Sequence, residues 1–223
     1  LQDVSELVRS RTEAVTANRI KQNFLSNISH EVRTPMNGLM GILELLEQTR
    51  LDNEQQEYVT VLQKSAKTLM IVINDLLDFS RIESGEMSEN KLDFDLRILL
   101  DSVTDELKEK ADNKNLNLEL TIHQQVPSLL KGDPQKIRQI LFHLLDNAVK
   151  FTQKGWVKID VNILKETPEQ ATLCFEVSDS GIGIKSEELE FVFDSFSQSD
   201  ASATRKFGGV GIGLSLCRRL VQY

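Results

Sequence analysis

From Leu25 to Leu46, apolar residues recur at every third or fourth position, and this run constrains the fold more than any other feature. Such spacing is typical of a helix that buries one narrow stripe against partner helices. On this period His30 lies furthest from the stripe, and Thr34, one turn later, shares its outward side. The sequence therefore predicts a solvent-facing histidine on a rigid helix. The apolar positions are Leu25, Ile28, Val32, Pro35, Leu39, Ile42 and Leu46.

An ordinary exposed histidine is the simplest interpretation of His30, and its neighbours provide a functional alternative. An acid, Glu31, follows it directly, and Pro35 follows within the next turns. Proline lacks a backbone N–H, and Gly38 and Gly41 loosen the turns that follow, so we expect a bend just after the histidine. Two interpretations of that bend stay open: a plain kink, or a hinge that changes access to the imidazole.

A second amphipathic helix follows after a short turn. The first helix is expected to end near residues 48–50, and Asp52 with Gln55 forms a weak capping box for the next one. Two such helices make a hairpin with too little core of its own. Two copies would make a four-helix bundle, so we predict a homodimer through this segment. The second stripe consists of Tyr58, Leu62, Ser65, Leu69, Val72, Leu76 and Phe79.

Composition excludes several classes of protein. The net charge of −8 argues against a general nucleic-acid or acidic-membrane binder. The two cysteines, Cys174 and Cys217, have no metal-ligand spacing and are interpreted as reduced thiols of a cytosolic compartment. The sequence contains no secretory signal and no apolar run of membrane-spanning length. We therefore expect a cytoplasmic module.

Changes in pattern divide the chain into two predicted domains, 1–86 and 91–223. Residues 1–23 are polar with sparse apolar positions, and they indicate either a fraying end or a coiled coil that carries a signal from an upstream sensor domain. Residues 83–90 are charged, contain Gly85 and break the periodicity, which is typical of a linker.

The second domain mixes helices with alternating strands. Asp133 and Pro134 are a capping residue and a first-turn proline, so they predict the start of a helix that runs to about Phe151. Alternation of apolar residues indicates strands on either side of it. This order predicts helices packed on a mixed sheet, an α/β two-layer sandwich. The expected strands are 92–96, 116–122, 157–163 and 173–177, with a hairpin turn at 167–169; further helices are expected at 96–113 and from about 211.

The helix that ends at Phe151 carries two different stripes. Its apolar stripe is predicted to be Ile137, Leu141, Leu144 and Ala148. A second stripe holds His143, Asn147 and Lys150, which share one face. An amide and an ammonium on one face can bind a metal ion and a phosphate together. A polar face turned to water is the alternative.

A glycine-rich turn follows the last predicted strand, with the sequence Asp179-Ser-Gly-Ile-Gly-Ile184. Asp179 has the parity of the inward residues of that strand, and an acid where the buried side ends needs a partner. The exocyclic amino group of a purine would suit it, because an ionised carboxylate only accepts hydrogen bonds. Gly181 and Gly183 would let the backbone approach a flat base. An ordinary tight turn is the alternative.

Residues 195–207 are small and polar, and they lead into the glycine-rich segment 208–213 and a helix. Glycines before a helix offer free amides and the positive end of the helix dipole to phosphates. The polar stretch is typical of a mobile lid, from which Arg205 and Lys206 could reach phosphate oxygens.

These segments resemble the conserved boxes of sensor histidine kinases. The string Ser26-Asn-Ile-Ser-His-Glu-Val-Arg-Thr-Pro35 resembles their phosphoacceptor box, particularly that of hybrid kinases. The helix ending at Phe151, the turn 179–184, the segment Phe193–Phe196 and the segment 208–213 are similar to the N, G1, F and G2 boxes. Those boxes belong to the ATP-binding fold that histidine kinases share with gyrase, heat-shock chaperones and mismatch-repair proteins.

The resemblance implies a fold and an activity. The fold would be an α-helical hairpin that forms a dimeric four-helix bundle, followed by a histidine kinase/gyrase-like α/β two-layer sandwich. The activity would be an ATP-dependent autokinase of a two-component phosphorelay, which phosphorylates His30 and passes the phosphoryl group to an aspartate on a response-regulator receiver domain. The parent protein would be an inner-membrane sensor.

The resemblance also implies residue roles. Glu31 would be the general base for His30, and Glu31 with Thr34 matches the E-x-x-T pattern that supports phosphatase action on a receiver. Asn147 would bind Mg²⁺ and Lys150 the phosphates of ATP. Asp179 would recognise the adenine amino group. The other nucleotide-binding positions would be Phe151, Gly181, Gly183, Phe196, Arg205, Gly209, Gly211, Gly213 and Leu214.

Two departures from the family pattern keep other functions open. His143 stands where the N box usually has a first asparagine, which puts metal affinity or nucleotide geometry in doubt. The sequence also stops at Tyr223, before the closing strands that such domains have. A degenerate kinase acting as a dimerising regulator and an ATPase of the same fold are therefore the alternatives. His123 is interpreted as structural.

Overall fold

The computed structural model describes residues 28, 31–87, 90–167, 169–194 and 211–222. The chain divides into two compact units, Leu1–Met87 and Ser88–Tyr223. Within the described residues, no helix is both long enough and apolar enough to cross a lipid bilayer.

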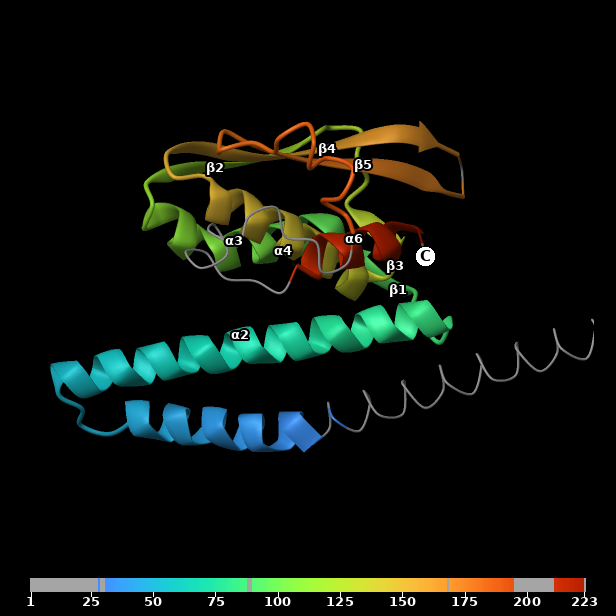
Figure 1. The fold of residues 1–223 in the computed structure, drawn as a ribbon. Helices are drawn as coiled ribbons and strands as arrows, with labels where there is room; N and C mark the ends of the chain where they lie inside the picture. The colour runs from blue at the N-terminus through green and yellow to red at the C-terminus, as the bar shows by residue number, and fades with distance from the viewer. Residues whose placement is uncertain (1–27, 29–30, 88–89, 168, 195–210, 223) are drawn as a thin grey trace, which may run out of the picture. The chain divides into compact units, whose positions relative to one another are not determined.

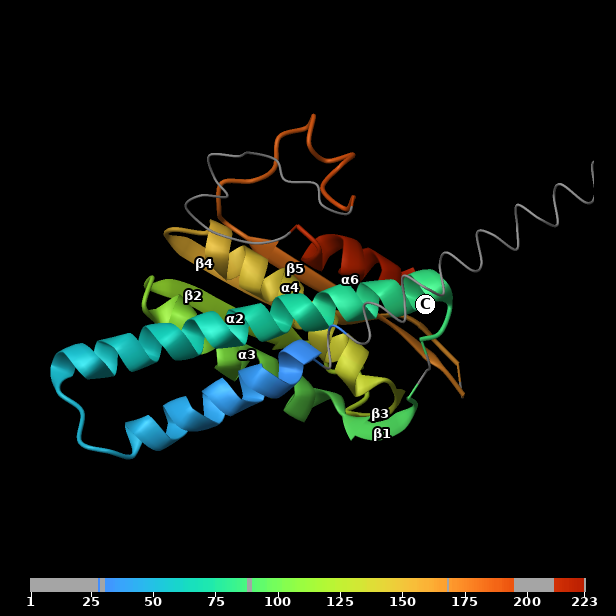
Figure 2. The same ribbon diagram turned by 60° about the horizontal axis from the view of Figure 1, so that its bottom comes forward.

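The first unit is a helical hairpin. Residues 31–47 are helical, and helix α2 (Asn53–Ser84) lies alongside them (Figures 1 and 2). The predicted capping box is confirmed: Gln55 N donates to Asp52 Oδ1 at 2.8 Å, and Asp52 N donates to Gln55 Oε1 at 3.1 Å. The helix ends at Gly85, whose φ of 70° is the left-handed conformation that glycine adopts without steric cost. Helix 31–47 continues through Pro35.

The predicted apolar stripes of the hairpin are largely exposed in the single chain. Leu39 is 55% exposed and Ile42 57%, whereas Met36 and Leu43 are buried. On α2 the same difference appears, since Tyr58 and Leu62 are exposed while Val59, Ala66 and Leu77 are buried. The stripe that each helix buries within one chain is therefore displaced from the predicted stripe. A pair of helices can cover only one side of each helix, so the predicted stripes remain uncovered.

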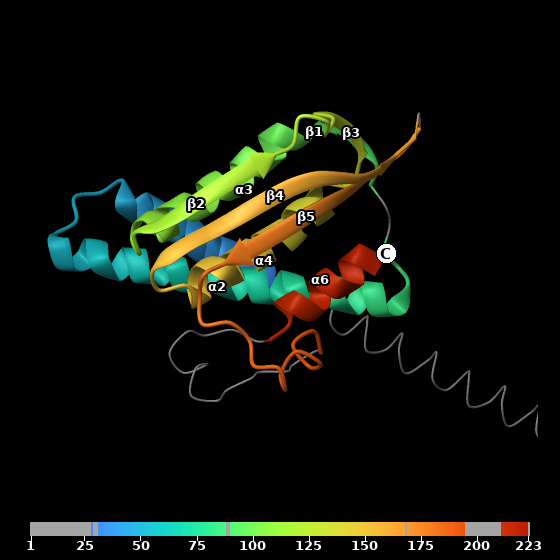
Figure 3. The ribbon, with the colours of Figure 1, turned by 90° about the horizontal axis from the view of Figure 1, so that it is seen from above.

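The second unit is an α/β two-layer domain, as predicted. Figure 3 shows strand β4 between β2 and β5, and helices α3, α4 and α6 lie against one face of this sheet (Figure 1). The pairing is mixed, because β2 is parallel to β4 and β5 is antiparallel to it. A separate two-stranded sheet pairs β1 with β3. The elements are β1 (Leu92–Asp95), α3 (Leu96–Asp112), β2 (Leu116–Ile122), β3 (Leu129–Gly132), α4 (Pro134–Phe151), β4 (Gly155–Glu166), β5 (Ala171–Asp179) and α6 (Gly213–Gln222).

Three details differ from the predictions for this domain. Leu141 and Ala148 of α4 are buried as predicted, but Leu144 is only half-buried and its neighbour Leu145 is fully buried instead. Helix α6 begins at Gly213 rather than near Gly211, which instead has a positive φ of 73°. Strand β3 was not predicted, because a four-residue strand paired only with β1 has too little alternation to be recognised.

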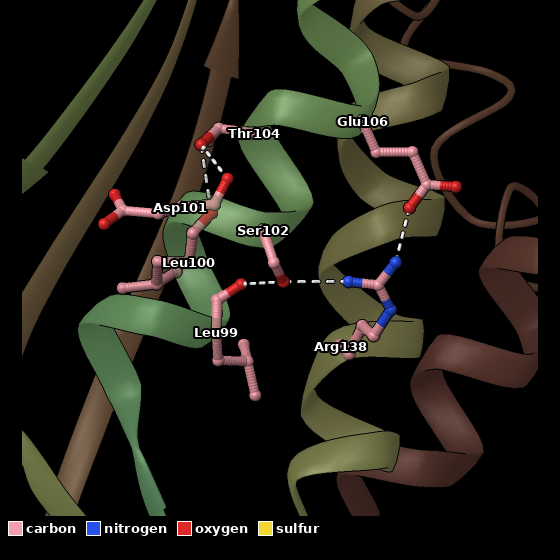
Figure 4. Close-up of polar contacts among 7 residues, drawn as sticks. All are labelled: Leu99, Leu100, Asp101, Ser102, Thr104, Glu106 and Arg138. Carbon is pink, nitrogen blue, oxygen red and sulfur yellow. Dashed lines mark hydrogen bonds and ion pairs between the residues drawn. The ribbon is translucent and has the colours of Figure 1, made fainter.

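A line of polar contacts joins α3 to α4. Arg138 of α4 donates to Ser102 Oγ at 2.9 Å and to a carboxylate oxygen of Glu106 (Figure 4). One turn further along α3, Lys110 Nζ contacts Asp146 Oδ1 at 2.7 Å. Because the two helices share these contacts as well as the apolar core, α4 is held along its length against α3.

Candidate functional site

The predicted phosphoacceptor, His30, lies outside the described residues. Its predicted partners Glu31 and Thr34 belong to helix 31–47, and both are exposed. The exposure of these two neighbours agrees with the prediction that this side of the helix faces away from its buried stripe.

Helix α4 carries the polar stripe as predicted. Its N-cap Asp133 accepts a hydrogen bond from Lys136 N at 3.2 Å, which fixes where the helix starts. His143, Asn147 and Lys150 are all half-buried. These side chains are therefore partly covered by the rest of the domain and partly open to a ligand or to water.

Lys150 has an electrostatic environment suited to an anion. Burial lowers the pKa of Lys150 from its ordinary value of 10.5, and the Asp146 carboxylate opposes this shift. Its Nζ lies 4.9 Å from the centroid of the Phe151 ring. A partly desolvated ammonium gains more from an approaching phosphate than an exposed one, because the local dielectric constant is lower.

His143 contacts the start of α6. A Cβ atom added to Gly213 would lie 3.2 Å from His143 Nδ1, so the imidazole already packs against this first residue of the helix. The ring also packs edge-on against Phe142, with the centroids 6.2 Å apart. The structure thus brings the predicted N box together with the end of the predicted G2 box, where Ile212 is buried and Leu214 half-buried.

The carboxylate of Asp179 organises the turn that follows β5. Its Oδ1 accepts a hydrogen bond from Gly181 N at 2.8 Å and a long one from Thr152 Oγ1 at 3.5 Å. The residue has the parity predicted, since it pairs with the buried Val157. Strand β5 ends at Asp179 and the residue is exposed, so the carboxylate stands where the buried side of the strand ends, as predicted.

Gly181 allows this turn to approach the end of α4. A Cβ atom at this position would lie 2.7 Å from the Phe151 carbonyl oxygen, 2.8 Å from Asp179 Oδ1 and 2.9 Å from Thr152 Oγ1. No side chain fits there without displacing backbone. Gly183 is different: none of the described residues comes within 4 Å of a Cβ added there, but its φ of 68° favours glycine.

An open cavity of about 460 Å³ adjoins this turn. It is lined by Gln153 and Lys154, which follow α4, and by Ser180, Gly181 and Ile182 of the turn itself. The segment that follows α4 and the glycine turn therefore form two walls of one concave region.

The remaining predicted positions have mixed outcomes. Gly211 adopts a positive φ, as a glycine-specific turn requires. Phe193 is 42% exposed. Phe196, Arg205, Lys206 and Gly209 lie outside the described residues.

Sequence reasoning missed Thr152. Its side chain is fully buried, and its hydroxyl points to the same carboxylate oxygen as Gly181 N. A hydroxyl residue directly after a helix that carries the predicted phosphate-binding lysine is the sequence signal that could have identified it.

A divalent cation would find different donors at the two N-box positions. The amide oxygen of Asn147 is a hard ligand of the kind that Mg²⁺ prefers, whereas the imidazole of His143 suits softer metals. Among the described residues, no three His, Cys, Asp or Glu side chains converge as a metal site. The fit to Mg²⁺ thus depends on Asn147 with oxygen atoms from a ligand.

Two family models match the chain. Residues 20–85 match the His Kinase A (phospho-acceptor) domain, and residues 132–223 match the Histidine kinase-, DNA gyrase B-, and HSP90-like ATPase. These matches fall on the hairpin and on the α/β domain, and together they define the phosphotransfer core of a two-component signalling protein. The first family implies dimerisation and response-regulator partners, and the second implies ATP as the ligand.

The chain belongs to the sensor histidine kinases. It is 42% identical over 217 residues to the sensor protein GacS of Pseudomonas syringae pv. syringae, which covers 97% of this chain and 24% of GacS. It is 40% identical to the sensory/regulatory protein RpfC of Xanthomonas campestris pv. campestris, over 97% of this chain and 30% of RpfC. The chain thus spans less than a third of these relatives.

Solved structures agree with this assignment. The structure of full-length ShkA in complex with AMPPNP superposes with a TM-score of 0.67 at 32% identity, covering 89% of this chain and 40% of ShkA. The Acinetobacter baumannii histidine kinase AdeS has the same fold, with a TM-score of 0.56 at 22% identity and 86% of each chain covered.

Proposed function

We propose that this chain is an ATP-dependent protein histidine autokinase, with residues 1–86 as the phosphoacceptor hairpin and residues 91–223 as the catalytic domain. The observation that carries the proposal is the Gly181 turn, whose backbone approaches the end of the same helix that holds Asn147 and Lys150. This approach supports a site in which Asp179 accepts from a base and the polar groups of α4 bind phosphates. The relative ShkA was solved with an ATP analogue, which supports the same ligand here.

In this proposal the nucleotide is held at two ends. One oxygen of Asp179 is engaged by Gly181 N and Thr152, so the other oxygen accepts from the adenine amino group. Lys150 contacts the phosphates, and Asn147 supplies an oxygen ligand to Mg²⁺. When bound, Mg²⁺ would offset the negative charge of the phosphate oxygens. Phe151, Gly183, Gly211, Gly213 and Leu214 would shape the pocket, with Phe196, Arg205 and Gly209 contributing from outside the described residues.

The proposed chemistry is an in-line phosphoryl transfer. A neutral imidazole nitrogen of His30 forms a bond to the γ-phosphorus, the bond to the β–γ bridging oxygen breaks, and ADP leaves. Glu31 accepts the imidazole proton. A histidine of ordinary pKa, about 6.5, is mostly neutral at pH 7, as this step requires. The phosphoryl group then passes to a receiver aspartate. In the phosphatase reaction, Thr34 would orient the water that hydrolyses the aspartyl phosphate of the receiver and releases inorganic phosphate.

The exposed stripes of the hairpin support a homodimer. Leu39, Ile42, Tyr58 and Leu62 are apolar, exposed in the single chain and spaced as bundle positions. A second copy of the hairpin would cover them and complete a four-helix bundle. We further propose that an upstream sensor domain transmits its signal to this bundle, and that the module acts on the cytoplasmic side of an inner-membrane sensor protein.

Labelling with γ-³²P-ATP tests the autokinase directly. The wild-type chain should acquire acid-labile label that His30→Ala lacks. His123→Ala is the matched control, because His123 is an exposed histidine that pairs with Asp160 at 3.1 Å, away from the proposed site. Label that survives in His30→Ala, or a wild-type chain that binds no Mg·ATP at millimolar concentrations, would overturn the proposal.

One observation favours a second candidate, a degenerate kinase that regulates by dimerising. His143 occupies the N-box position where an amide is expected, and its ring is packed against Gly213. In this case neither protein labelling nor phosphate release would be seen, the dimer would remain intact, and His143→Asn would restore labelling. Phosphate release without labelling would instead indicate an ATPase.

A further inference from the structure

Lys114 makes three hydrogen bonds to the end of helix α4. Its Nζ donates to the carbonyl oxygens of Val149 at 2.7 Å, Lys150 at 2.9 Å and Thr152 at 3.2 Å. These are all three donors that an ammonium possesses. The side chain is part-buried, and its acceptors lie 35 to 38 residues away along the chain.

The local backbone places this lysine at the end of α4. Lys114 lies in the turn between α3 and β2, where its N–H donates to Ala111 O and Asn115 adopts a left-handed φ of 54°. Strand β2 then begins at Leu116, paired with Gly155, the first residue of β4. The turn before β2 and the turn before β4 therefore lie side by side, and Lys114 joins them.

An ammonium at this place satisfies a specific requirement of the helix. The last four carbonyl groups of an α-helix have no partner within the helix, and the helix dipole makes that end negative. Glycine or a solvated end usually meets this requirement, but α4 ends at Thr152 in an extended conformation with a φ of −93°. Because Thr152 is fully buried, a charged donor from another element fixes the end of the helix.

The same few residues form the proposed nucleotide site. The carbonyl oxygens of Lys150 and Thr152 both accept hydrogen bonds from Lys114. The ammonium of Lys150 belongs to the proposed site, and the hydroxyl of Thr152 donates to Asp179. Between them, the Phe151 carbonyl lies against Gly181. A change in the path of residues 149–152 would move the base end and the phosphate end of the site together.

We propose that Lys114 is a positioning residue for nucleotide binding, which holds the end of α4 so that Lys150 and Asp179 face one ligand. This inference rests on the proposed function, since it assumes a nucleotide at that site. Lys114 itself contacts no ligand in this proposal. Arg138 provides the matched comparison, because it is also a cation that joins α4 to a neighbouring segment, but it lies about three turns before Lys150.

Nucleotide binding to the full chain tests this proposal without any labelling of His30. The dissociation constant of a non-hydrolysable ATP analogue with Mg²⁺ would be measured for Lys114→Met, Lys114→Arg and Arg138→Met, together with each melting temperature. We expect Lys114→Met to weaken binding roughly tenfold, because the variant leaves three carbonyl acceptors at the end of α4 without their donor and no longer fixes that end. Lys114→Arg should recover most of the affinity, because a guanidinium also donates several hydrogen bonds. Arg138→Met should lower the melting temperature and leave the affinity unchanged.

The possible results distinguish a failure of the positioning role of Lys114 from a failure of the proposed function. Wild-type affinity in Lys114→Met, or equal loss in Lys114→Met and Arg138→Met, overturns the positioning role while leaving the nucleotide site intact. Absence of binding in the wild type overturns the proposed function, and the role of Lys114 with it. If Lys114→Met does not fold, the outcome rests on Lys114→Gln: an amide keeps part of the hydrogen bonding, and a loss of affinity greater than that of Arg138→Met is expected.

Discussion

Replacing Gly181 by alanine would test whether the nucleotide site depends on close approach of two backbone segments. The new Cβ would lie 2.7 Å from the Phe151 carbonyl oxygen, whereas carbon–oxygen contacts are normally about 3.3–3.6 Å, so the shortfall is about 0.6 Å or more. Phe151 O belongs to helix backbone and cannot rotate away. The turn must therefore move, which lengthens the bond from Gly181 N to Asp179 Oδ1.

Overpacking of this kind costs about 1–3 kcal/mol. If this whole cost appears in the free energy of binding, nucleotide affinity falls roughly 5- to 150-fold, at 1.4 kcal/mol for each factor of ten. Titration calorimetry with a non-hydrolysable ATP analogue measures this effect, and thermal melting shows how much of the strain appears in stability instead. Gly132→Ala is the control, because its Cβ would meet Phe94 at an ordinary 3.6 Å. If Gly181→Ala binds and melts like the wild type, the geometric reasoning is wrong.

Three further predictions concern charge and helix ends. Burial lowers the pKa of Lys150, so the unfolded state holds this proton more tightly than the folded state. Between the lowered pKa and 10.5, the free energy of unfolding should therefore rise with pH, while nucleotide affinity falls as the ammonium loses its charge. Lys150→Arg should flatten the profile of affinity against pH, because arginine stays charged. Asp52→Ala removes the capping box of α2 and should cost about 1 kcal/mol in denaturant unfolding, with Asp52→Asn close to wild type. Gly85→Ala forces a side chain into a φ of 70°, although none of the described residues would clash with it. We expect the free energy of unfolding to fall by about 1–2 kcal/mol in the same assay, and nucleotide affinity to stay unchanged.

Periodicity and capping predicted most of the fold. The Asp133–Pro134 start and the Phe151 end of α4 follow from local sequence, and so does the cap of α2. Burial within each helix was predicted less well. Leu144 and Leu145 are both apolar, and only the position of the neighbouring core decides which one turns inward. In the hairpin, each helix has more apolar positions than one partner can cover, so the sequence could not show which stripe is buried within the chain.

In the site, the residues that hold the motifs in place could not be predicted from the sequence. Motif spacing placed Asn147, Lys150 and the glycine turn on the correct elements, but the contacts that organise them join residues far apart in sequence. Thr152 reaches Asp179 across 27 positions, and Lys114 reaches the same helix end across 35 or more. Neither residue belongs to a recognisable pattern, because a single hydrogen bond between distant segments leaves no periodic trace. Parity correctly gave the strand face of Asp179, which pairs with the buried Val157 at the end of β5.

The contacts at the end of α4 have a consequence for how such a module can work. The bonds from Lys114, the turn at Gly181 and the packing of His143 on Gly213 are all contacts within the protein itself. A site held in its binding geometry by such contacts would lose little conformational entropy when a ligand arrives, so more of the contact energy would appear as affinity. ATP and ADP have the base in common, so contacts with the base do not distinguish them. In the proposed kinase, selection of ATP over ADP and commitment to transfer must therefore come from the phosphate end, where the Lys150 ammonium is partly desolvated and responds most to added negative charge.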